Sequence, residues 1–264
     1  MTYLQAILLG LVQGLTEFLP VSSSGHLVLG GQVLGVEDRT DVLFEVLVHM
    51  GTLVAILVVF RARIAGLLGA AIGKGTSENR RLLGLLVVGT VPAGVAGIAL
   101  EDFFETLFSS VLSVSVALIV TGLILRAARE RKDASGNLGW AQVFAVGMAQ
   151  AAAITPGISR SGATIAMALR LGITQTAAAE LSFLLAIPTI GGAFVLKLGD
   201  VAASHGSGTL GPYLVGMGVA ALSGWGALRW LLVLLRRGKF HHFSWYCWAV
   251  GGVGVLCSIC SQGV

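Results

Sequence analysis

Two short polar segments stand out because their side chains could do chemistry inside an otherwise apolar chain. The first reads Q-G-L-T-E-F-L-P-V-S-S-S-G-H from Gln13 to His26. Gln13 and Glu17 are four residues apart, so they lie on one face of a helix. Glu17 could act as a general base or hold a divalent cation such as Mg²⁺ or Ca²⁺. Ser23 could be a nucleophile, and His26 could be a nucleophile, a base or an acid.

The second polar segment reads P-G-I-S-R-S-G-A-T from Pro156 to Thr164 and offers the chemistry of an anion site. Arg160 supplies a planar, permanently charged fork for phosphate oxygens. Both segments break a helix-like stretch and open a short helix, whose free N–H groups bind phosphate readily. The expected catalytic residues are Glu17, Ser23, His26 and Arg160. The expected phosphate-binding residues are Ser22, Ser24, Ser159, Arg160, Ser161 and Thr164. The expected supporting residues, whose glycines allow close approach to the backbone, are Gln13, Gly25, Gly157 and Gly162.

Each of these residues also has a structural interpretation. The serines after Pro20 could simply cap the next helix, and Glu17 and Arg160 could neutralise each other as an ion pair. A charge in a membrane segment costs roughly 2.5–3.5 kcal/mol on insertion scales, which favours a function for both residues. We interpret three further polar residues near the ends of apolar spans as packing or helix-end residues: Glu45, His49 and Glu180.

Composition places the two segments in a membrane protein. The chain has 264 residues, of which 55% are hydrophobic and only 11% are charged, and its mean hydropathy is +0.88. A soluble domain carries about 25% charged residues, so the surface of this chain must face lipid. The net charge of +4 comes from short basic clusters between apolar runs. That distribution fits loops beside a membrane and argues against a nucleic-acid partner.

The elements that position the polar segments form a repeat. Six apolar segments are about long enough to cross a bilayer, at about 42–60, 82–100, 110–127, 177–197, 211–235 and 244–261. The polar segments interrupt two further stretches, which we expect to be re-entrant helix-loop-helix hairpins. A shift of 137 residues, the separation of Ser22 and Ser159, aligns the two hairpins and three following spans. The sequence predicts one all-α polytopic membrane domain, 1–264, with repeats at about 1–132 and 138–264.

The number of spans fixes the relative orientation of the repeats. Each repeat has three spans, an odd number of crossings, and a hairpin that adds an even number. The second repeat must therefore be inverted relative to the first. The basic clusters then fall on one side, which makes that side cytoplasmic; they are Arg61, Arg63, Lys74, Arg80, Arg81, Arg126, Arg129, Arg131, Lys132, Arg236, Arg237 and Lys239. The acidic residues fall on the other side; they are Glu37, Asp38, Asp41, Glu101, Asp102, Glu105 and Asp200. We therefore expect the first hairpin to enter from outside, the second to enter from the cytoplasm, and their tips to meet.

The segment from Gln13 to His26 resembles the first signature of the bacterial undecaprenyl-diphosphatase family, the bacitracin-resistance phosphatases. The segment from Pro156 to Thr164 resembles the second, and the likeness extends over nearly the whole chain. The first signature begins with Glu or Gln in that family. Because position 13 is Gln here, Glu17 is the essential carboxylate of this helix.

The resemblance implies hydrolysis of undecaprenyl diphosphate to undecaprenyl phosphate, the lipid carrier of cell-wall synthesis, and bacitracin resistance. It also implies a multi-pass protein of the bacterial plasma (inner) membrane, with a site open to the periplasm and supported by a divalent cation. Membrane lipid and undecaprenyl diphosphate are the expected partners.

Other functions fit parts of the pattern. Inverted repeats with broken helices also build transporters, so the chain could be a lipid-phosphate transporter or flippase. A structural scaffold is the third alternative, against which Glu17 and Arg160 argue. The sequence leaves open whether Ser23 or His26 attacks, which cation is preferred, which prenyl chain lengths are accepted and whether the chain forms a homodimer.

Overall fold

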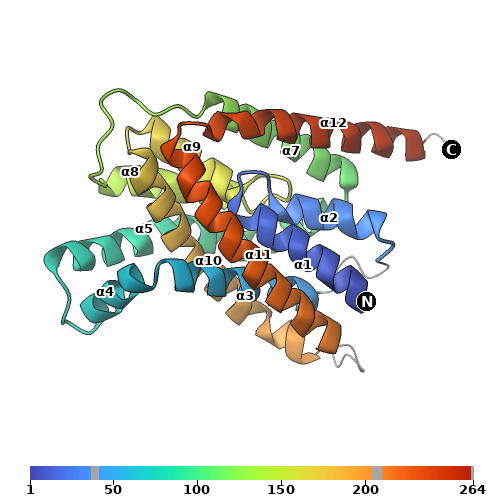
Figure 1. The fold of residues 1–264 in the computed structure, drawn as a ribbon, viewed down its shortest axis with the longest axis horizontal. Helices are drawn as coiled ribbons and strands as arrows, with labels where there is room; N and C mark the ends of the chain where they lie inside the picture. The colour runs from blue at the N-terminus through green and yellow to red at the C-terminus, as the bar shows by residue number, and fades with distance from the viewer. Residues whose placement is uncertain (37–41, 204–209, 263–264) are drawn as a thin grey trace.

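A computed structural model describes residues 1–36, 42–203 and 210–262, and in these ranges the chain is helical, with a single isolated bridge between Ser135 and Ile173. The helices are α1 (Tyr3–Phe18), α2 (Ser23–Val33), α3 (Val42–Val59), α4 (Arg61–Ala71), α5 (Ser77–Ala99), α6 (Glu101–Phe108), α7 (Val111–Ala127), α8 (Trp140–Ala152), α9 (Arg160–Arg170), α10 (Gln175–Ala203), α11 (Leu210–Arg236), the 3₁₀ turn η1 (Phe240–His242) and α12 (Phe243–Gln262). The all-α prediction is therefore confirmed (Figure 1).

Several helices are long and apolar enough to cross a membrane. Within the described residues four pass this test alone, at Ser77–Ala99, Gln175–Lys197, Leu210–Arg236 and Phe240–Cys260. Two more spans are reached only if α3 is taken with α4 and α6 with α7. Each of the six expected spans therefore coincides with a helix, and the chain is a multi-pass membrane protein.

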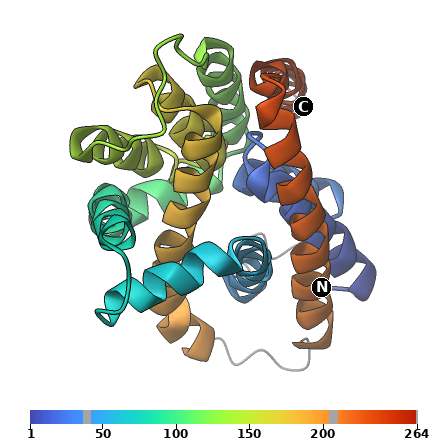
Figure 2. The same ribbon diagram turned by 60° about the vertical axis from the view of Figure 1, so that its left-hand side comes forward.

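The loops next to two spans contain helices that the sequence analysis did not predict. The segment that follows the expected span at 42–60 begins with α4, which turns by 87° from α3, and Figure 2 shows α4 leading sideways from the end of α3. Similarly, α6 makes an angle of 99° with α7. Alanine, leucine and arginine favour helix in α4, but a run of 11 residues is too short to stand out beside spans.

The acidic loop residues are only partly described. Glu37, Asp38 and Asp41 lie outside the described residues, and so does the side chain of Asp200. On α6, Glu101 and Glu105 both accept from Lys197 Nζ near the end of α10, at 3.1 and 2.9 Å. These ion pairs hold α6 against the end of a span.

Glycines allow the helices to pack with their backbones in contact. α1 lies along α11, and α8 lies along α5 (Figure 1). A Cβ atom on Gly10 would collide with the backbone of Gly216, and one on Gly147 would collide with the backbone of Gly89. Small residues at helix crossings are the usual basis of packing in membranes, where burial of apolar surface gives little drive. Each broken hairpin is thereby clamped to one long helix.

Local contacts recur at the 137-residue shift. Gln5 Nε2 donates to the Leu34 carbonyl at 3.1 Å, and Gln142 Nε2 donates to the Leu171 carbonyl at 2.8 Å. Both contacts tie the start of a hairpin to its end. The same shift also relates Gly35 to Gly172, which both have positive φ, and Ser22 to Ser159, which both cap helices.

Candidate active site

The first break lies between α1 and α2. Pro20 ends the helix, and Ser22 caps the next one, accepting from the Gly25 N–H at 3.4 Å. Ser22 has φ +67°, the only positive φ of a non-glycine residue in the described ranges. Such a conformation is strained and persists only where the surroundings fix it. The break therefore holds Ser23, the first residue of α2, in a defined position.

The second break lies between α8 and α9. Gly157 has φ +93°, and Ser159 caps α9 by accepting from the Gly162 N–H at 3.0 Å. Thr121 of α7 joins both sides of the turn, since its Oγ1 donates to the Gly157 carbonyl at 2.8 Å and accepts from the Ser159 N–H at 3.0 Å. Arg160 follows as the first residue of α9. Ser22 and Ser159 therefore both cap helices, a role that the structural interpretation expected of the serines after Pro20.

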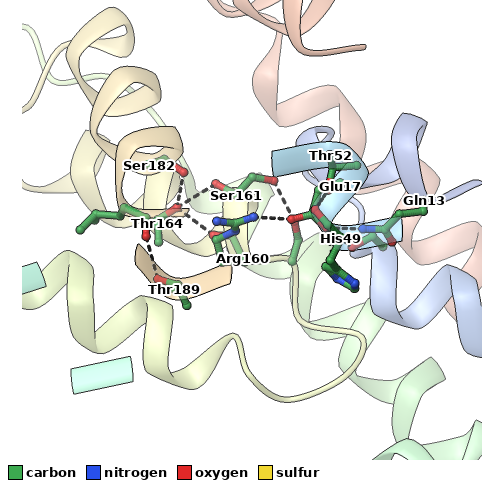
Figure 3. Close-up of polar contacts among 12 residues, drawn as sticks. Gln13, Glu17, His49, Thr52, Arg160, Ser161, Thr164, Ser182 and Thr189 are labelled. Carbon is green, nitrogen blue, oxygen red and sulfur yellow. Dashed lines mark hydrogen bonds and ion pairs between the residues drawn. The ribbon is translucent and has the colours of Figure 1, made fainter. Parts of the chain in front are cut away.

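The two tips meet at Glu17, as Figure 3 shows. Arg160 Nη2 donates to Glu17 Oε1 and forms an ion pair with it. Ser23 Oγ donates to Glu17 Oε2 at 2.5 Å, and Gln13 Nε2 donates to the same oxygen at 3.1 Å. Glu17 is 7% exposed. A buried carboxylate thus accepts from residues of both broken hairpins.

Two buried polar atoms of this cluster have no hydrogen-bond partner in the part of the chain that the structure describes. They are Arg160 Nη1 and Gln13 Oε1. Buried donors and acceptors are nearly always paired in folded proteins, so an unpaired one needs a reason. Arg160 Nη1 is a charged donor beside the N-terminus of α9, which suits an oxygen of a phosphate group.

The remaining hydroxyls of the second segment are bonded to protein. Ser161 Oγ donates to the Leu19 carbonyl at 3.2 Å and so joins the two breaks. Thr164 Oγ1 lies 2.7 Å from Ser182 Oγ of α10 and 2.8 Å from the Arg160 carbonyl. In the first segment Ser24 Oγ lies 3.2 Å from Ser22 Oγ. These residues shape the loops that hold Arg160 and Ser23.

His26 turns away from Glu17. Its Nδ1 lies 2.8 Å from the Ser22 carbonyl, and its Nε2 lies 2.9 Å from the hydroxyl of Tyr246 on α12. The His26 and Tyr246 rings stack with centroids 5.6 Å apart. Within the described residues no hydrogen bond or ion pair links His26 to Glu17, Ser23 or Arg160.

His49 lies at the site, although the sequence analysis assigned it to packing. Its Nε2 is 3.7 Å from Glu17 Oε2, and Figure 3 shows the ring beside that carboxylate. A single histidine in an apolar span has no local pattern that would have revealed this contact. The interpretation of Glu180 as a helix-end residue agrees with its ion pair to Arg63, at 2.7 Å from Nε.

The oxygen donors fit a cation only in part. The described residues contain no cluster of three or more His, Cys, Asp or Glu that could hold a metal. Glu17 and the unpaired Gln13 Oε1 remain as oxygen ligands. Mg²⁺ commonly binds one or two protein carboxylates and completes its shell with phosphate oxygens and water. The residues therefore fit a cation that is shared with a phosphorylated substrate.

Comparison with known proteins gives one consistent relationship. The chain is 44% identical over 257 residues to an undecaprenyl-diphosphatase of Carboxydothermus hydrogenoformans, covering 95% of both chains. It is 42% identical over 256 residues to that of Halothermothrix orenii, with 95% of this chain and 96% of the relative covered. It is 38% identical over 276 residues to that of Methanobrevibacter smithii, with 98% and 99% covered. The family model described as bacitracin resistance protein BacA matches residues 6–253, and the chain belongs to that family.

Proposed function

We propose that the chain hydrolyses undecaprenyl diphosphate to undecaprenyl phosphate and inorganic phosphate, and thereby recycles the lipid carrier and confers bacitracin resistance. The relatives that match it over nearly their whole length are named undecaprenyl-diphosphatases. One observation in the structure carries the chemistry: a serine hydroxyl lies 2.5 Å from a buried carboxylate that also pairs with an arginine. A nucleophile, a base and an anion-binding group are thus in contact.

The geometry supports attack by Ser23. Ser23 Oγ would form a bond to the terminal phosphorus while the bond from that phosphorus to the bridging oxygen breaks, and undecaprenyl phosphate leaves. Glu17 Oε2 would accept the Ser23 proton, because the two oxygens are already hydrogen-bonded. Arg160 Nη1 would hold a terminal phosphate oxygen and neutralise its charge. Water then cleaves the phosphoserine to inorganic phosphate and restores Ser23.

A divalent cation would bind at Glu17 and Gln13 Oε1 together with substrate phosphates. When bound, it would neutralise charge on the diphosphate. Arg160 and the N-terminus of α2 face the same region, so cationic groups of the chain share that role.

The identity of the nucleophile can be tested by rapid quench with terminally labelled substrate. Phosphoserine survives acid, whereas phosphohistidine survives base and is lost in acid. We expect acid-stable label on the wild-type protein and none on Ser23→Ala. Acid-labile, base-stable label would move the attack to His26. That histidine is the weaker candidate because both of its ring nitrogens are engaged elsewhere.

We propose that the chain has six spans and two re-entrant hairpins in two inverted repeats, at about 1–132 and 138–264. The contacts that recur at the 137-residue shift support the repeat. The grouping of basic residues on one side supports an inner-membrane protein whose first hairpin enters from the periplasm. The active site would then face the periplasm.

We propose that the prenyl chain lies in a groove between α1, α11 and α12. A cavity of about 570 Å³ is lined there by six apolar side chains, Leu15, Leu19, Val21, Trp230, Leu234 and Phe243, and by four polar ones, Thr16, Lys239, His242 and Tyr246. Leu19 and Val21 belong to the first break, and Tyr246 is bonded to His26, so the groove borders the phosphate site. A Leu15→Trp or Leu234→Trp exchange should raise the KM for a long prenyl diphosphate more than for a short one.

Transport of a lipid phosphate is the second candidate function, because broken helices meeting at their tips also build carriers. The contact between Ser23 and Glu17 favours hydrolysis, since a carrier needs donors and charge but no nucleophile. Phosphate release by the purified protein in detergent separates the two functions. Release by the wild type that is lost in Ser23→Ala supports the hydrolase.

A further inference from the structure

His49 approaches Glu17 from a helix that belongs to neither hairpin. It lies on α3, and its Nδ1 is 2.8 Å from the Glu45 carbonyl one turn earlier. A carbonyl oxygen can only accept, so Nδ1 must carry the hydrogen of this bond. That bond fixes the ring orientation and leaves Nε2 to face Glu17 Oε2 at 3.7 Å, where the imidazolium form, with a hydrogen on each nitrogen, attracts the carboxylate. The imidazole is therefore aimed at the carboxylate rather than merely near it.

The helix that carries His49 is fixed in place. A Cβ atom on Gly51 would collide with the backbone of Met217, so α3 and α11 are in backbone contact at this level. Thr52 is fully buried, and its Oγ1 donates to the His49 carbonyl at 2.8 Å. Figure 3 shows Thr52 and His49 grouped around Glu17. A register fixed by backbone contact keeps the imidazole at a constant distance from the carboxylate.

A comparison of the two repeats distinguishes residues that support the hairpins from residues that could take part in the reaction. At the 137-residue shift several polar residues that cap, tie or support the hairpins are identical in both halves: Gln5 and Gln142, Gln13 and Gln150, Ser22 and Ser159, Ser24 and Ser161, and Thr52 and Thr189. Gln13 also contacts Glu17, but three other pairs of positions at this site differ between the halves: Glu17 and Ile154, Ser23 and Arg160, and His49 and Ala186. His49 therefore behaves as a site residue, because its counterpart is a buried alanine that needs no polar partner.

We infer that His49 is a positioning residue for Glu17 in the proposed phosphatase reaction. Arg160 holds Oε1 from α9, while His49 borders Oε2 from α3. Together they limit rotation of the carboxylate, so that Oε2 stays directed at the Ser23 hydroxyl. This inference rests on the proposed function, since it assigns His49 to the step in which Glu17 accepts the Ser23 proton.

The test compares His49→Ala and His49→Gln with the wild type in a phosphate-release assay on purified protein. We expect His49→Ala to lower kcat by about ten- to a hundred-fold, the range that a misplaced catalytic group produces. KM should change by less than about threefold, because His49 acts through Glu17. His49→Gln should recover part of kcat, since its amide can still donate toward Oε2.

Matched controls separate positioning from folding. His241→Ala removes a histidine of η1, a turn that contacts α7 and α12, and it should keep wild-type kcat. Elution and thermal unfolding in detergent report the folded state. If His49→Ala does not fold, His49→Gln is compared with His49→Asn, which is one methylene shorter and should have the lower kcat.

Three results would overturn the inference. They are a kcat of His49→Ala within about twofold of wild type, equal losses for glutamine and alanine, and a loss confined to KM. Absence of phosphate release by the wild type itself would instead contradict the proposed function.

Discussion

Exchanging Arg160 should separate its structural role from its catalytic one. The two terminal nitrogens of the guanidinium differ: Nη2 pairs with Glu17, and Nη1 has no hydrogen-bond partner among the described residues. The pair is well buried, with side-chain exposures of 16% for Arg160 and 6% for Glu17. Removing one partner of a buried pair leaves an uncompensated charge, which destabilises a protein by about 3–5 kcal/mol. Arg160→Ala should therefore lower both the melting temperature and the turnover.

The expected magnitudes differ among three variants. For a chain of this size, that loss of stability corresponds to a melting temperature lower by roughly 6–20 °C in Arg160→Ala. Its turnover should fall about 10²- to 10³-fold or more, as on removal of a charge-stabilising donor. Arg160→Lys keeps a cation beside Glu17, so its melting temperature should change little. A single ammonium cannot replace a guanidinium that binds Glu17 and phosphate together. The turnover of Arg160→Lys should therefore fall about 10- to 100-fold.

The double variant Glu17→Gln with Arg160→Met distinguishes the structural role of Arg160 in the ion pair from its role in binding phosphate. Replacing both charges by neutral residues of similar size is often neutral or stabilising. Its melting temperature should therefore return to within a few degrees of wild type while phosphate release stays lost. Melting is followed by unfolding in detergent, and turnover by phosphate release at saturating substrate. Wild-type turnover in folded Arg160→Ala, or recovery of turnover in the double variant, would refute the assignment of Arg160 to phosphate.

Three further predictions concern topology, the first break and the second break. In a background without Cys247, Cys257 and Cys260, a cysteine at position 75 should stay unlabelled by an impermeant thiol reagent added to intact cells; labelling from outside would reverse the proposed orientation. Tyr246→Phe should lower kcat less than about tenfold, because it removes one partner of His26 and leaves Ser23 with Glu17; a loss as large as that of Ser23→Ala would favour His26 as the nucleophile. Thr121→Val leaves the Gly157 carbonyl and the Ser159 N–H without their partner, so it should destabilise the folded state by about 1–3 kcal/mol per unpaired group in thermal unfolding, whereas Thr121→Ser should retain most of that stability.

The helices that cross the membrane could be predicted because long apolar runs have few alternatives. Segment length placed the six expected spans on helices, and the polar residues around Pro20 and Pro156 marked the two breaks. The helices α4 and α6 could not be recognised, since each is short and begins with charged residues. Their sharp turns from α3 and α7 fall at Phe60 and at Ser109 and Ser110, where neither Gly nor Pro marks a break.

The site could be predicted where its residues lie together in the chain. Glu17, Ser23 and Arg160 come from two compact polar segments, and the structure brings them into contact. The contacts of His26 and His49 could not be predicted in this way, because each contact joins helices that are remote in sequence. The contact between His26 and Tyr246 joins residues 220 positions apart, and no local spacing encodes such a distance.

Because Arg160 is ion-paired with Glu17, the Glu17 carboxylate competes for this guanidinium with every anion that enters the site. Arg160 Nη2 is already bound to a carboxylate of the same chain, so an incoming phosphate gains only the unused nitrogen unless it displaces Glu17. We therefore expect the site to bind free inorganic phosphate weakly and the released phosphate to inhibit the reaction little. The same tether sets a design rule for inhibitors: a neutral or cationic group placed against Glu17, joined to one anionic group at Arg160 Nη1, should bind better than a second anion.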